Sequence, residues 1–64
     1  MKKKELKILA KKIAEAELII QNSLDAKAVS KAQQTILELS HKITSYEDMM
    51  MVDELVQEIL SQKS

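Results

Sequence analysis

One pair of residues in this 64-residue chain has a spacing that occurs among the metal ligands of helical proteins. Glu38 and His41 lie three residues apart, the E-x-x-H spacing that places a carboxylate and an imidazole on one side of a helix in di-metal bundles. Such a site needs further glutamates from neighbouring helices and an inward orientation. Both residues point away from the apolar positions around Leu39, so we expect them to face solvent and predict no metal site.

Other catalytic patterns are missing from the sequence. Ser40 is adjacent to His41, but neighbouring residues on a helix point about 100° apart, so the two do not form a nucleophile–base pair. The chain has no cysteine and no glycine, which excludes a thiol nucleophile and a glycine-rich phosphate loop. We therefore predict that the protein is not an enzyme and uses no cofactor and no small-molecule substrate.

Apolar side chains that recur alternately three and four residues apart indicate which secondary-structure elements carry Glu38, His41 and the rest of the chain. This period places each set on one side of an α-helix and does not suit a strand, which alternates with period two. The three sets predict helices over about 3–21, 26–42 and 46–61, in a single domain spanning 1–64. They are Leu6, Leu9, Ile13, Ala16 and Ile20; Val29, Ala32, Ile36, Leu39 and Ile43; and Met49, Val52, Val56 and Ile59.

The helix boundaries follow from polar residues, because the chain has neither glycine nor proline to end a helix. Asp25 is the expected N-cap of the second helix. Two capping boxes compete at the start of the third helix, Thr44 with Glu47 and Ser45 with Asp48.

Short links between helices of similar length favour antiparallel neighbours. The sequence therefore predicts a small all-α protein, an up-down-up three-helix bundle with an aliphatic core. A chain this short and without disulfides has a small core, for which self-association is a common supplement. A helical hairpin or open trio completed by homodimerisation is the alternative.

Several large apolar residues fall outside the predicted core stripes and are candidates for a protein-contact surface. Methionine side chains adapt well to partner surfaces, whereas scattered exposed hydrophobes are also normal in folded proteins. The five candidates are Ile8, Ile19, Leu37, Met50 and Met51.

Charges are unevenly distributed although the net charge is zero. A basic ridge of Lys3, Lys4, Lys7 and Lys11 lies on the first predicted helix, and an acidic ridge of Glu47, Glu54 and Glu58 on the third. The basic ridge suggests nucleic-acid binding as an alternative function. Against it stand the lack of arginine, the single aromatic residue and the acidic third helix.

These observations favour a non-catalytic protein–protein interaction module, a small regulator, adaptor or inhibitor that docks a helical face on a partner protein or on itself. Lysine-only basic usage with abundant isoleucine is typical of low-GC bacteria, their phages and plasmids. No stretch approaches the roughly 20 apolar residues of a membrane span, and the lysine-rich start lacks a following apolar run. We expect a cytoplasmic protein.

Overall fold

The computed structural model describes residues 2–63, with the backbone alone at position 63, and these residues form three α-helices. They are α1 (Lys3–Asn22), α2 (Ala26–His41) and α3 (Tyr46–Lys63). The fold is the predicted small all-α three-helix bundle. Within the described residues, no helix combines the length and the apolar character that crossing a lipid bilayer requires.

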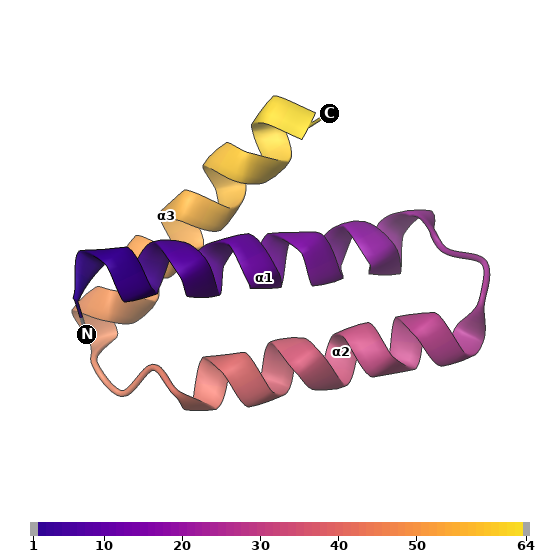
Figure 1. Cartoon of the computed structure of the whole chain (residues 1–64), viewed down its shortest axis with the longest axis horizontal. Coiled ribbons are helices and arrows are strands. Elements are labelled where there is room, and N and C mark those ends of the chain that lie inside the picture. The colour runs from indigo at the N-terminus through magenta and orange to yellow at the C-terminus, as the bar shows by residue number, and fades with distance from the viewer. Residues whose placement is uncertain (1, 64) are drawn as a thin grey trace.

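Helix α1 is the centre of the arrangement. The chain runs along α1, returns antiparallel to it along α2, and runs forward again along α3, which passes obliquely behind α1 (Figure 1). Both α2 and α3 pack against α1 but make few contacts with each other. The molecule measures 34 × 25 × 16 Å, so its shortest dimension holds only two layers of helices at interaxial distances of about 8–10 Å.

The link between α1 and α2 is fixed by local hydrogen bonds. The Ser23 backbone N–H donates to the Ile19 carbonyl at 2.8 Å and closes the last turn of α1. The Asp25 carboxylate accepts from the Lys27 backbone N–H at 3.0 Å, which confirms Asp25 as the N-cap of α2. The Ser23 hydroxyl oxygen accepts from the Asp25 N–H at 3.1 Å, so the short link has a defined conformation.

Helix α3 begins at Tyr46, one residue after Ser45. The Met49 backbone N–H donates to the Ser45 carbonyl at 3.0 Å, and the N-cap is the residue whose carbonyl accepts the first helical hydrogen bond. Of the two competing frames, the structure therefore favours Ser45 as the N-cap.

The core is aliphatic and is centred on the amino-terminal two-thirds of α1. Its α1 members extend beyond the predicted stripe to Ala10 and Ala14, which are 1% and 0% exposed. Two residues along a helix correspond to a rotation of about 200°, so Ala14 lies on the opposite flank of α1 from Ala16 and faces α3. The buried cluster comprises Leu6, Leu9, Ala10, Ile13, Ala14, Leu39, Ile43, Val52 and Val56.

One predicted core position is wrong. Met49 belongs to the apolar stripe of α3 but is 50% exposed. It lies in the first turn of α3, and because α2 and α3 make few contacts with each other, the Met49 side chain lies at the edge of an open hollow.

Candidate protein-contact surface

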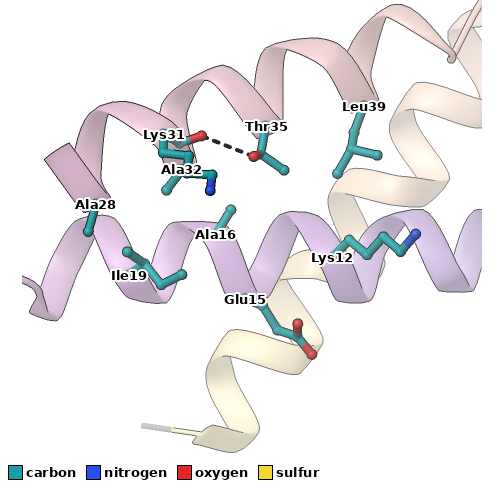
Figure 2. A pocket seen from close by; sticks show the side chains of 9 residues that line it. All are labelled: Lys12, Glu15, Ala16, Ile19, Ala28, Lys31, Ala32, Thr35 and Leu39. Carbon is teal, nitrogen blue, oxygen red and sulfur yellow. Dashed lines mark hydrogen bonds between the residues drawn. The ribbon is translucent and has the colours of Figure 1, made fainter.

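A groove runs between α1 and α2 on the face of the molecule opposite α3 (Figure 2). Its floor is made of small side chains, with Ala16 from α1 facing Ala32 from α2 and Ala28 further along α2. Alanine methyl groups fill little of the space between the helices, so the groove has a volume of about 480 Å³. We refer to it as the α1–α2 groove.

The rim of the α1–α2 groove combines charged and apolar side chains. Lys12 and Lys31 line it from opposite helices, and Glu15 points away from α2 (Figure 2). The Thr35 hydroxyl donates to the Lys31 carbonyl at 3.0 Å, so its hydrogen is already used within α2. Ile19 of α1 lines the groove toward the carboxyl terminus of this helix and is 44% exposed.

Ile8 lies on the same side of the molecule as Ile19. It lines a smaller hollow together with Glu5, Leu9, Lys12 and Lys42, and Lys12 also lines the α1–α2 groove. The two hollows thus form one continuous surface on which both candidate isoleucines are accessible.

The other three candidate contact residues lie elsewhere. Leu37 is 59% exposed, and its separation from Thr35 by two residues places it on the opposite flank of α2 from the groove. Met50 and Met51 are 50% and 41% exposed on α3. The structure therefore distributes the five candidates over more than one surface, and their role in binding stays a prediction.

Sequence reasoning missed three exposed hydrophobic residues. Leu24 lies in the link before α2 with its side chain fully exposed, and Tyr46 and Met49 begin α3 with 76% and 50% exposure. The sequence could have indicated that Leu24 is exposed, because this residue lies outside every helical stripe. It gave no such signal for Met49, whose spacing fits the stripe of α3.

A second hollow lies between α2 and α3 on the other side of α1. It has two parts that share Glu17 and Ile36, and we call the whole hollow the α2–α3 wedge. Toward the carboxyl terminus of α1 the wedge is lined by Ile20 and Leu60, and near the second link by Met49. It exists because α2 and α3 both pack on α1 and diverge from each other.

The two charged ridges are both accessible. Lys3, Lys4, Lys7 and Lys11 of the basic ridge and Glu47, Glu54 and Glu58 of the acidic ridge are all exposed. Lys7 and Lys11 also line a small hollow with Leu55 and Ile59 of α3, where their alkyl stems cover apolar surface while their ammonium groups stay in water.

Groups that could hold a metal are not brought together in the part of the chain that the structure describes. No cluster of three or more His, Cys, Asp or Glu side chains occurs among residues 2–63. Glu38 and His41 are both exposed on α2, as their orientation relative to Leu39 predicts.

Comparison of the chain with protein-family models, with curated proteins and with solved structures finds no match.

Proposed function

We propose that this protein is a non-catalytic interaction module that docks a helical surface on a partner protein or on a second copy of itself. One observation carries the proposal: the five large apolar residues that the sequence singles out as contact candidates are all 41–59% exposed. Exposed apolar area on a chain this small favours association, because its burial removes it from water.

The surfaces suit helix-on-helix docking. The alanine floor of the α1–α2 groove allows close approach of another helix, and the rim residues Lys12 and Lys31 offer charges that orient a partner. The exposed methionines of α3 add flexible side chains that adapt to different shapes. Self-association, a cytoplasmic location and a low-GC bacterial or phage source belong to the same proposal.

The double substitution Met50→Lys and Met51→Lys tests the proposal. Association, measured by sedimentation velocity over a concentration series, should be lost, while the helical circular dichroism stays unchanged because both side chains are exposed. The matched control is Gln33→Lys with Gln34→Lys, which makes the same change in charge on exposed positions of α2.

Two results would contradict the proposal. Loss of helicity in the methionine variant would show that these side chains stabilise the fold rather than a contact. Equal association of the methionine variant, the glutamine control and the unsubstituted chain would show that the exposed α3 residues take no part in binding.

A further inference from the structure

The α2–α3 wedge combines an apolar lining with negative charge. We propose that it binds one amphipathic helix of a partner protein whose polar flank carries lysine or arginine. This inference rests on the proposed function, and it specifies the binding site and the chemistry of the partner.

The apolar lining comes from all three helices. Ile20 of α1, Ile36 of α2 and Leu60 of α3 are each half-buried and line the wedge. Met49 adds a 50% exposed side chain near the second link. A helix inserted here would cover apolar surface that α2 and α3 leave uncovered by diverging.

The charged residues that line the wedge are all acidic. Glu17 lines both parts of the wedge and is half-buried, and Asp53 lines the part near the second link. Among residues 2–63, the wedge is lined by these two carboxylates and by no lysine. An anionic helix would therefore bring like charges together, whereas a cationic helix would find opposite charges beside its apolar contacts.

The length of the wedge also suits a helix. On α3 it extends from Met49 to Leu60, which is about 17 Å at 1.5 Å per residue, or roughly three helical turns. A helix from a second copy fits less well, because the apolar stripes of α1, α2 and α3 already contribute to the core of their own chain. A helix from a different protein is the occupant that the lining favours.

Two designed peptides test the proposal on the full chain. Both are 18-residue amphipathic helices with leucine at the same positions, one with lysine and the other with glutamate on the polar face. Fluorescence anisotropy of labelled peptides at an ionic strength of about 0.15 M, where the Debye length is about 8 Å, should show the leucine–lysine peptide binding at least about tenfold more tightly.

Charge reversal locates the binding in the wedge. The double substitution Glu17→Lys and Asp53→Lys should reverse the preference in favour of the leucine–glutamate peptide. The matched control, Glu54→Lys with Glu58→Lys, makes the same change in net charge on the acidic ridge and should alter the affinity for either peptide by less than about threefold, because exposed charges are screened.

A steric block provides an independent readout. Gln57 is exposed and lines the wedge, so Gln57→Trp should fill part of it and weaken binding of the leucine–lysine peptide about fivefold or more. Gln34→Trp places the same side chain at an exposed position of α2 that does not line the wedge and should leave binding unchanged. Circular dichroism establishes that each variant keeps its helices.

Three outcomes would overturn the proposal. The first is equal affinity for both peptides or no binding of either. The second is an equal loss of binding in the wedge variant and the acidic-ridge control, which would indicate attraction to net charge alone. The third is a homodimer that Gln57→Trp dissociates, which would make a second copy the occupant. A chain that binds neither peptide but still associates through Met50 and Met51 would refute the wedge proposal and leave the proposed function standing.

Discussion

The two ends of the molecule differ in how many helices meet there. At the end where the link of residues 42–45 joins α2 to α3, which we call the packed end, all three helices contribute buried side chains, such as Leu6, Leu39 and Val52. At the other end, which we call the open end, α2 and α3 have diverged (Figure 1). The apolar residues there, including Ile20 and Leu60, are only half-buried.

This difference shows how a short chain can fold and still keep apolar surface accessible. A side chain of α1 at the packed end has neighbours on both flanks, from α2 and from α3. Toward the open end, a side chain of α1 has fewer neighbours, so the apolar stripe of α1 is left partly exposed there. We therefore expect stability to come mainly from the packed end and binding to use the surfaces that remain open.

The largest expected effect is a loss of stability from truncating a core residue at the packed end. Leu6 is 2% exposed, so Leu6→Ala should lower the free energy of unfolding by about 2–5 kcal/mol. Because cores of this size contribute only about 3–5 kcal/mol in total, much of the variant should be unfolded. Ile20→Ala at the open end should cost less than half as much. Urea denaturation followed by circular dichroism measures both, and equal losses would refute the distinction between the two ends.

A smaller effect is expected from enlarging one alanine on each side of α1, at the contact with α3 and in the groove between α1 and α2. Ala14 is fully buried on the flank that faces α3, so Ala14→Leu should destabilise the fold by about 1–3 kcal/mol through overpacking. Ala28 lines the open α1–α2 groove, so Ala28→Leu should change the stability by less than about 0.5 kcal/mol. Thermal unfolding of the two variants compares the flanks, and a neutral Ala14→Leu would show that α3 does not pack closely on α1.

Removing the N-cap at the open end should have an effect of about 1 kcal/mol. Asp25→Ala loses the hydrogen bond to the Lys27 N–H and with it the first-turn cap of α2. Asp25→Asn is the control, since an asparagine side chain caps almost as well. If both variants melt at the temperature of the unsubstituted chain, the cap does not stabilise this end.

The smallest effect concerns the basic ridge near the packed end. Lys7→Gln with Lys11→Gln should change the free energy of unfolding by less than about 0.5 kcal/mol, because both ammonium groups are exposed. We also expect the unsubstituted chain to show no detectable binding to duplex DNA at low salt, since α3 places acidic side chains on the same small molecule. DNA binding that weakens steeply with salt and depends on Lys7 and Lys11 would instead support the nucleic-acid alternative.

Local structure was largely accessible from the sequence, because the three- and four-residue spacing reports the helical period directly. The predicted ranges 3–21, 26–42 and 46–61 differ from the helices of the structure by two residues or fewer at each end. Asp25 was recognisable as an N-cap because its side chain acts within two residues of its own position.

The arrangement of the helices was less accessible, because it depends on contacts between distant residues. Ala10 and Ala14 lie outside the apolar stripe predicted for the first helix, so their burial became apparent only from the packing. The same holds for Glu17, whose charge marks it as a surface residue in the sequence but which lines the wedge. The apolar periodicity of α2 and that of α3 give no indication that the two helices diverge from each other.

The separation of α2 and α3 can be measured directly by double electron–electron resonance, which reports the distance between two spin labels. The chain has no native cysteine, so labels attach only to introduced ones. We predict that the distance between exposed positions 30 and 62 at the open end is clearly longer than the distance between positions 42 and 47 at the packed end. Equal distances at both ends would show a closed bundle without a wedge and would contradict the account.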